Sequence, residues 1–323
     1  MQRYVKRFTE VAADMIEQCG GKGAHLGELT QAGYKVPQGF SIVSQAYFDM
    51  LNYNKLDLEI EGIANSIDFS NYKDVEQKTQ RIRELIENCK LPPSYEEISQ
   101  AYIELVKGDN FEHYVAVRSS VAVKGTTISS FPGMMDTYHY IQGIDQVIRK
   151  VRECWGSLWT SRAAMMRYHK GINHFDAIIA PVIQRMVDSE VAGVLFTANP
   201  INSSKKEIVI ESNWGLGESV VSGKSINDLF ILDKESLEIS TKKISDKNMR
   251  FGLNKENGIG RKEYVIEQQM RKQPSLNNEQ LTKLGEVGKS IEKYFGVSQD
   301  IEWAFENGNL YILQARKIRT LKQ

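Results

Sequence analysis

The feature that most constrains the fold of this sequence is the alternation of short apolar runs with amphipathic helical patterns. Leu281, Leu284 and Ile291 fall on one face of a helix that Gly296 would end. Segments 193–197 and 207–211 are instead short branched runs typical of strands. Helical patterns dominate the first half of the chain and strands the second. The sequence therefore predicts a mixed α and β fold.

The length and this change of pattern predict two domains. The chain has 323 residues, and domains usually run to roughly 100–200 residues. Helix-rich sequence gives way to strand-rich sequence near residues 180–190. We therefore expect a helix-rich N-terminal lobe, residues 1–185, and a strand-rich C-terminal lobe, residues 186–323.

Charge and composition exclude several classes of protein. Lys and Arg number 41, as do Asp and Glu, so we expect no nucleic-acid partner. No apolar stretch approaches the roughly 18 residues of a membrane span, and no secretory leader is visible at the start. Three widely spaced cysteines (Cys19, Cys89 and Cys154) suit a reducing cytoplasm and are expected to be buried small hydrophobic residues.

A glycine-rich segment, Gly20-Gly21-Lys22-Gly23, precedes a predicted helix from about Ala24 to Ala32. Glycine lets a backbone approach a phosphate closely, and a helix start supplies N–H groups and the positive end of the helix dipole. Lys22 would add a mobile cation. On this match alone, a glycine-rich helix start with a solvated lysine is the simpler interpretation.

A second segment places an arginine at the end of a strand. Residues 114–117 read as a buried strand that delivers Arg118, and a long polar loop follows as far as Pro132-Gly133. An arginine in this place can make paired contacts to phosphate oxygens. A loop of this length without regular structure more often has a function than serves only as a surface connection.

The end of the chain reads as a β-hairpin. Segments 300–305 and 310–314 flank residues 306–309, which contain the strong turn signal Asn-Gly. One face of the hairpin would be filled by four apolar side chains: Ile301, Trp303, Tyr311 and Leu313.

The other face of the hairpin would be polar. Side chains two apart in a strand share a face, so Asp300 and Glu302 would point the same way. Gln314 and Arg316 would do so on the second strand. Carboxylate and amide oxygens suit Mg²⁺, which is usually shared with substrate phosphates. An exposed polar face with an ion pair fits these residues equally well.

Six segments in this order resemble a known family. They are GGKGAHLGEL…VPQGFSIV, YVAVRSS…FPGMMDT, APVIQRMV, AGVLFTANP, NWGLGE and QDIEWAFENGNLYILQAR. The set is similar to the nucleotide-binding domain of the phosphoenolpyruvate synthase and pyruvate, phosphate dikinase family, which rifampicin phosphotransferases share. The resemblance runs from about Tyr4 to Thr320. It implies an α+β, ATP-grasp fold: two lobes with the nucleotide in the cleft between them.

The resemblance also implies eight site residues: Lys22, Arg118, Gly133, Thr137, Gln184, Glu302, Gln314 and Arg316. The lysine and the two arginines would contact phosphates and be the catalytic cations. The glycine and the threonine would lie in the loop over the triphosphate. The first glutamine would sit at the hinge beside the adenine, and the glutamate and the second glutamine would hold Mg²⁺.

The family's chemistry implies an ATP-dependent phosphotransferase with ATP and Mg²⁺ as cofactors. In the family, a histidine on a separate swivelling domain takes the β-phosphoryl group, and ATP yields AMP and phosphate. A third domain then passes the phosphoryl group to pyruvate or to an antibiotic hydroxyl. We therefore expect a phosphohistidine domain, in cis or in trans, and a small-molecule acceptor as partners of a cytoplasmic protein.

The sequence also departs from the family. The glycine-rich histidine motif and the pyruvate-binding barrel are absent. Val123-Lys124-Gly125 stands where relatives usually carry an acidic pair, and Lys317 replaces a proline. The chain would be an excised domain, a subunit of a split enzyme, or a stand-alone ATP-grasp kinase or ligase that acts directly on a small molecule. A non-catalytic nucleotide-binding scaffold is the third hypothesis, which the retained charged residues argue against.

Overall fold

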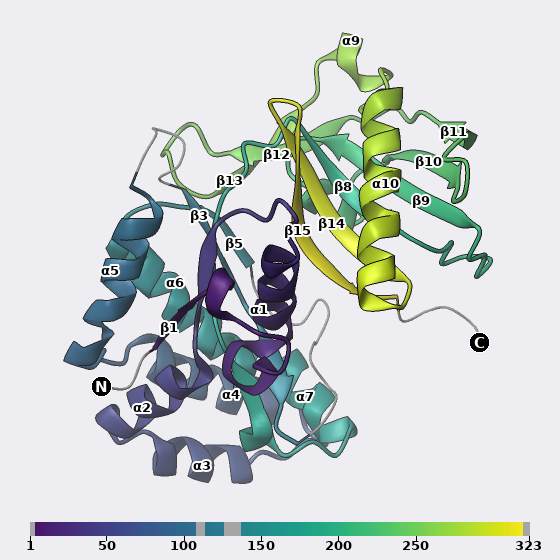
Figure 1. Ribbon diagram of the computed structural model, residues 1–323. Coiled ribbons are helices and arrows are strands. Elements are labelled where there is room, and N and C mark those ends of the chain that lie inside the picture. The colour runs from purple at the N-terminus through teal and green to yellow at the C-terminus, as the bar shows by residue number, and fades with distance from the viewer. Residues whose placement is uncertain (1–3, 108–113, 126–136, 319–323) are drawn as a thin grey trace. The chain divides into compact units, whose positions relative to one another are not determined.

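A computed structural model describes residues 4–107, 114–125 and 137–318, apart from the side chain of Ile178 (Figure 1). The chain divides into two compact units. The first contains Met1–Gly33 and Gln38–Met186, and the second contains Tyr34–Pro37 and Val187–Gln323. Both units combine helices with sheets, so the predicted α+β class is confirmed.

The first unit is built on a five-stranded antiparallel sheet. Its order is β1 (Val5–Arg7), β2 (Gly39–Ile42), β7 (Val182–Arg185), β3 (Val115–Arg118) and β5 (Thr137–Ile141). A second, two-stranded sheet pairs β4 (Val121–Val123) with β6 (Ala177–Ile179). The first strand of this small sheet lies in the segment that the sequence suggested would be irregular.

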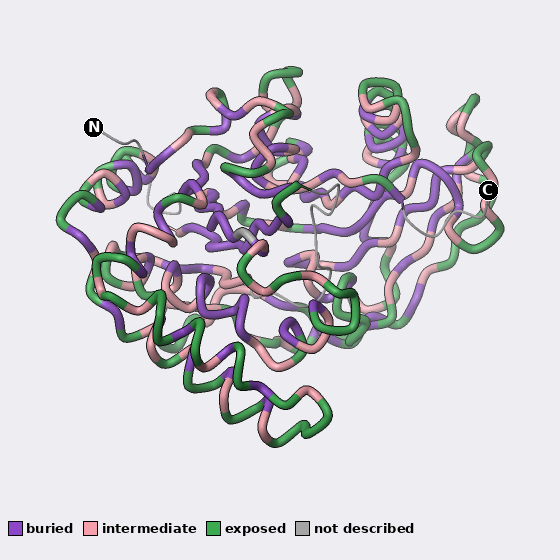
Figure 2. Tube along the Cα trace, turned by 90° about the horizontal axis from the view of Figure 1, so that it is seen from below, coloured by how far each residue is buried: buried purple, intermediate pink, exposed green. Residues whose placement is uncertain are grey.

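The described helices of the first unit are α1 (Ile16–Gln31), α2 (Ser44–Asn54), α3 (Asp57–Asn65), α4 (Tyr72–Glu87), α5 (Glu96–Leu105), α6 (Ile144–Gly156) and α7 (Ser161–His169). Short 3₁₀ turns are η1 (Phe8–Glu10), η2 (Pro93–Tyr95), η3 (Ser157–Trp159) and η4 (His174–Asp176). Thr160 separates η3 from α7 with an extended backbone, and its hydroxyl caps α7 by accepting from Ala163 N. Buried positions recur along the helices in Figure 2, as amphipathic packing on a shared core requires.

The second unit is built on a six-stranded antiparallel sheet. Its order is β11 (Ile239–Lys243), β10 (Asp228–Asp233), β9 (Glu207–Trp214), β8 (Val191–Phe196), β14 (Gln299–Glu306) and β15 (Asn309–Lys317). A separate hairpin pairs β12 (Met249–Leu253) with β13 (Arg261–Val265). Two short helices are α8 (Glu218–Val221) and α9 (Gln268–Arg271).

The long helix of the second unit, α10 (Asn278–Phe295), packs on β8 and β14 (Figure 1). Asn277 and Gln280 form a capping box at its start, and Gly296, with φ of 68°, ends it in the left-handed conformation. Gly288 allows close contact with the sheet, because a Cβ there would lie 2.8 Å from a methyl carbon of Leu195. The predicted helix and its glycine cap are confirmed.

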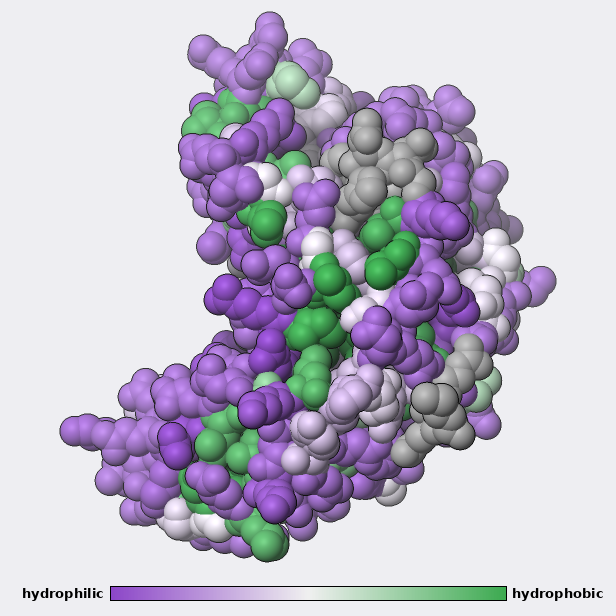
Figure 3. Space-filling model, turned by 90° about the vertical axis from the view of Figure 1, so that its left-hand side faces the viewer, coloured by the Kyte–Doolittle hydropathy of each residue, from purple (hydrophilic) through white to green (hydrophobic). Residues whose placement is uncertain are grey.

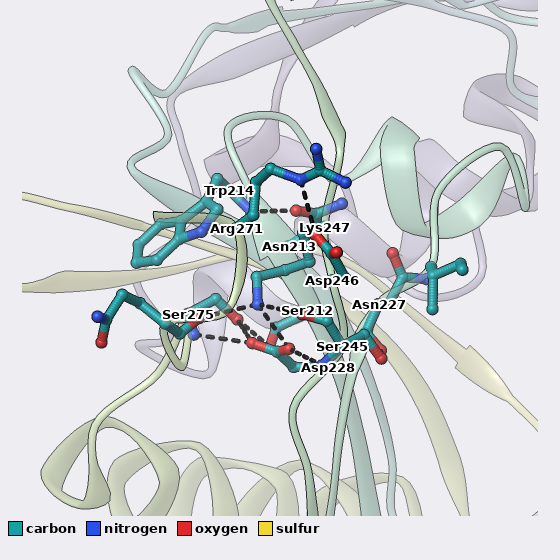
Figure 4. A network of polar contacts seen from close by, with 12 residues as sticks. Ser212, Asn213, Trp214, Asn227, Asp228, Ser245, Asp246, Lys247, Arg271 and Ser275 are labelled. Carbon is teal, nitrogen blue, oxygen red and sulfur yellow. Dashed lines mark hydrogen bonds and ion pairs between the residues drawn. The ribbon is translucent and has the colours of Figure 1, made fainter. Parts of the chain in front are cut away.

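A buried ion pair connects three segments of the second unit (Figure 4). Lys247 Nζ lies 2.7 Å from Asp228 Oδ1, and both side chains are 0% exposed. The other carboxylate oxygen accepts from Ser275 N and Oγ, each at 2.8 Å. Lys247 also donates to Gln273 O at 2.8 Å. Each charge is thus surrounded by hydrogen-bond partners, as burial of an ion pair requires.

The described residues include no helix that is long and apolar enough to cross a membrane. The face seen in Figure 3 is covered mainly by hydrophilic residues, and the apolar ones lie among them in small groups. All three cysteines are buried as free thiols, as predicted.

Candidate functional site

The glycine-rich segment forms a kink in α1. Gly20 has φ of 67° and ψ of 170°, so the helix is interrupted there and resumes at once. A Cβ on Gly20 would lie 2.3 Å from Ser120 Oγ and 2.5 Å from the Ser120 carbonyl carbon. Only glycine combines this φ with this approach to another backbone. The second helical part of α1 thus begins earlier than the predicted Ala24, and Lys22 lies in its first turn.

Lys22 is held against the end of β3. Its Nζ donates to Ser119 O at 2.9 Å. This contact brings the ammonium group to the segment that follows Arg118, about a hundred residues later in the chain. The two cations that the sequence proposed for phosphate binding in the first unit are therefore brought together.

Arg118 is the last residue of β3, as predicted. It is only 8% exposed, and its Nη1 donates to Gln184 Oε1 at 2.9 Å. The side chain that was expected beside the adenine thus contacts a phosphate-binding candidate. On the other side of β3, Thr137 lies opposite Arg118 in the register with β5.

Four of the predicted site residues therefore gather around β3: Lys22, Arg118, Thr137 and Gln184. Gly133, predicted to lie in the loop over the triphosphate, falls outside the described residues. One contributor was not singled out from the sequence. The hydroxyl of Ser120 bonds to both sides of the α1 kink, and no local pattern could have indicated this.

The remaining predicted residues lie together in the second unit, on the β14–β15 hairpin. Asp300 is paired in register with Arg316, and Glu302 with Gln314. Arg316 donates to Asp300 Oδ2 from Nε at 2.8 Å and from Nη2 at 2.7 Å. Burial raises the pKa of the Asp300 carboxyl, while Arg316 acts in the opposite direction. The predicted polar face is confirmed.

The predicted apolar face is only half right, because β15 contains a bulge. The register shifts after Glu302, so that Trp303 faces Ile312 and Tyr311 faces Ala304. Trp303 and Ile312 are buried on the apolar face. Tyr311 and Leu313 instead pack on the small cluster around Ala304, on the side of Glu302. Placing these two residues with Trp303 was wrong, because a bulge reverses the alternation beyond it.

The donor set on the hairpin fits a magnesium ion shared with a substrate. Gln314 Nε2 donates to Glu302 Oε1 at 3.3 Å, so the carboxylate and the amide reach the same point. A rotated amide would present its oxygen there, and Mg²⁺ prefers such hard ligands with substrate phosphates completing its shell. Within the described residues, no group of three or more His, Cys, Asp or Glu could hold a metal.

Comparison with known proteins identifies the family. The family model "Pyruvate phosphate dikinase, AMP/ATP-binding domain" matches residues 16–323. A probable phosphoenolpyruvate synthase from Pyrococcus horikoshii is 37% identical over 362 residues, which cover 99% of this chain and 44% of that protein. The phosphoenolpyruvate synthase of Pyrococcus furiosus gives the same values. Rifampicin phosphotransferase from Bacillus subtilis is 33% identical over 99% of this chain and 36% of its own length.

This chain spans less than half the length of these relatives. Among solved structures, D-alanine–D-alanine ligase from Bacillus anthracis is similar with a TM-score of 0.36 and 10% identity, over 96% of this chain and 59% of that one. That likeness is too weak to support an argument. The family match and the relatives agree over nearly the whole chain, which therefore belongs to the pyruvate phosphate dikinase AMP/ATP-binding domain family.

Proposed function

We propose that this chain is an ATP-dependent phosphotransferase domain that uses Mg–ATP to phosphorylate a histidine on a separate swivelling domain. The histidine takes the β-phosphoryl group. AMP leaves, and water releases the γ-phosphate as inorganic phosphate. The observation that carries the proposal is the gathering of Lys22 and Arg118 at the end of β3 in a chain of this family.

The cations explain how the domain would act. ATP phosphates repel a nucleophile, and positive groups held in place beforehand reduce this repulsion and stabilise the charge that spreads in the transition state. Arg118 is held by Gln184, and Arg316 by Asp300. Both guanidinium groups therefore lose little freedom when they bind phosphate.

The proposal includes an ATP-grasp arrangement in which residues 1–185 and 186–323 form two lobes that both contact the nucleotide. Gly133 and Thr137 would cover the triphosphate, and Gln184 would lie beside the adenine. Glu302 and Gln314 would hold Mg²⁺, which supplies further positive charge to the phosphate oxygens when bound.

The partners and the location belong to the same proposal. Relatives more than twice as long imply further domains in the full enzyme. One of them would carry the acceptor histidine, in cis or in trans, and the final acceptor would be a small molecule. We place the protein in the cytoplasm, where its free thiols stay reduced.

Product analysis tests this function. The chain is incubated with Mg–ATP, alone and with the histidine-bearing domain of a phosphoenolpyruvate synthase, and nucleotides are separated by chromatography. We expect AMP and phosphate only when that domain is present, and none when its histidine is replaced by alanine. Formation of ADP by the chain alone with a small-molecule acceptor would instead establish a stand-alone kinase or ligase. Absence of Mg–ATP binding in calorimetry would favour a scaffold.

A further inference from the structure

The kink in α1 separates two backbone groups that a continuous helix would join. In an unbroken α-helix, Gly23 N–H would donate to the carbonyl of Cys19, four residues earlier. Gly20 lies between them with non-helical φ and ψ. Ser120 Oγ bonds to both groups: it accepts from Gly23 N at 3.0 Å and donates to Cys19 O at 2.7 Å. A side-chain hydroxyl is thus inserted into the helical hydrogen-bond ladder.

The inserted hydroxyl is fixed in place. Ser120 is 1% exposed, and its own carbonyl accepts from Ala180 N at 2.8 Å. Gly20 packs directly on it, as the short distances to a Cβ at that position show. One buried hydroxyl therefore satisfies a buried donor and a buried acceptor, and both would lose their partner if it were removed.

The bridge fixes the position of Lys22 relative to Arg118. Lys22 lies within the bridged turn, between the kink at Gly20 and the Gly23 amide. Ser120 follows Arg118 by two residues, and the carbonyl between them accepts the Lys22 ammonium. A single hydroxyl thus ties the helix turn that carries one cation to the strand end that carries the other.

We propose that Ser120 is a positioning residue for the phosphate contacts of Lys22 and Arg118. The proposal rests on the function proposed above. Without the hydroxyl, the Gly23 amide and the Cys19 carbonyl lose the partner that they share. The turn after Gly20 is then no longer tied to the strand end, and Lys22 would move away from Ser119 O.

Ser120→Ala tests the proposal, with Ser41→Ala as the matched control. Ser41 is also a buried serine beside this turn, since a Cβ on Gly23 would lie 2.6 Å from its Oγ. Its hydroxyl interacts with the Cys19 thiol and not with the two backbone groups that Ser120 bridges. Calorimetry would measure Mg–ATP affinity, and ligand-observed NMR would measure the affinity for adenosine, which has no phosphate. Denaturant unfolding would report stability.

We expect Ser120→Ala to weaken Mg–ATP binding by about tenfold or more, the effect of losing a well-placed charged contact. Adenosine binding should be unchanged, and Ser41→Ala should bind both ligands as the wild type does. Equal loss of both ligands in Ser120→Ala would indicate a merely structural role and overturn the proposal. Unchanged Mg–ATP affinity in Ser120→Ala would also overturn it, whereas failure of the wild type to bind Mg–ATP would overturn the proposed function itself.

Two further measurements keep the test decisive if Ser120→Ala does not fold. Ser120→Cys keeps the size of the side chain but replaces the hydroxyl by a weak hydrogen-bonding thiol, and it should show the same selective loss of Mg–ATP affinity. In a spectrum of ¹⁵N-glycine-labelled protein, the Gly23 amide should exchange faster with solvent in this variant than in the wild type. An unchanged exchange rate, or full Mg–ATP affinity in Ser120→Cys, would contradict the bridge.

Discussion

At the scale of single residues, the structure buries an arginine outside the proposed site. Arg167 is fully buried in α7, and its Nε donates to His174 Nδ1 at 3.0 Å. Its guanidinium carbon lies 5.3 Å from the centroid of the Trp159 ring. Burial lowers the pKa of Arg167 to about 10. Burial, and then the Arg167 charge, lower the pKa of His174 to about 4.

This pair predicts acid sensitivity. Because the pKa of His174 falls from about 6.5 in the unfolded chain to about 4, the unfolded state binds the proton first as the pH falls. The neutral His174 side chain makes its full contribution to stability above about pH 6.5, and this contribution is lost as the pH falls towards 4. From pH 7 to pH 5, the free energy of unfolding should therefore fall by about 2 kcal/mol. His174→Gln should remove this pH dependence in denaturant unfolding, whereas His169→Gln, at the exposed end of α7, should keep the wild-type slope.

A second residue-scale prediction concerns the metal. Glu302→Gln removes one charged oxygen from the Glu302–Gln314 pair. The Mg²⁺ concentration that supports half-maximal ATP binding should therefore rise by about tenfold or more. Titrations of Mg²⁺ at fixed ATP would measure it, with Glu263→Gln, an exposed carboxylate of β13, as the control. The same metal dependence in Glu302→Gln and wild type would remove Glu302 from the proposed site.

At the scale of elements, the second unit depends on a polar connection as well as on apolar packing. The apolar face of its sheet is covered by α10, while the Asp228–Lys247 pair joins the start of β10 to the loops at residues 245–247 and 273–275. Neither charge contacts solvent. Removal of one partner would leave the other charge buried and unpaired.

Lys247→Met should therefore lower the free energy of unfolding by about 3–5 kcal/mol. The double variant Asp228→Leu with Lys247→Met should be less destabilised than Lys247→Met alone, because no charge is left behind. Lys234→Met provides the control: its ion pair with Glu292, at 2.9 Å, is partly exposed, and its loss should cost about 1 kcal/mol or less. Urea unfolding would compare them, and equal effects of the two lysine variants would contradict this account.

At the scale of the whole molecule, the cations proposed for one nucleotide are divided between two compact units. Lys22 and Arg118 belong to the first unit, and Arg316 to the second. If both units contact the nucleotide, full stabilisation of the chain by the bound nucleotide requires the cations of the first unit and the cation of the second.

Mg–ATP at about 100 times its dissociation constant should stabilise the wild type by about 2.7 kcal/mol, and the melting temperature should rise accordingly. At the same ligand concentration, Arg118→Ala and Arg316→Ala should each lose most of this rise. Each variant is compared with its own ligand-free melting temperature, because Arg118 is buried and its removal also lowers stability. A full rise in Arg316→Ala would remove Arg316 from the proposed phosphate contacts.

Local sequence signals predicted several elements well. The hairpin turns at Asn307 and Gly308, whose φ angles of 49° and 73° are the left-handed values that Asn-Gly favours. The amphipathic pattern that ends at Gly296 correctly predicted α10, and the apolar run before Arg118 correctly predicted β3. These predictions succeeded because helix period, strand alternation and turn chemistry act between residues that are near in the chain.

The sequence by itself determined the family, the kinds of element and the residue types available for phosphate and metal. Only the tertiary structure decided how these residues are held. Lys22 meets Ser119 across 97 residues, and Ser120 reaches Cys19 across 101. The bulge in β15 moved Tyr311 to the opposite face without any local signal. Such contacts depend on where distant segments pack, and periodicity along the chain does not encode that.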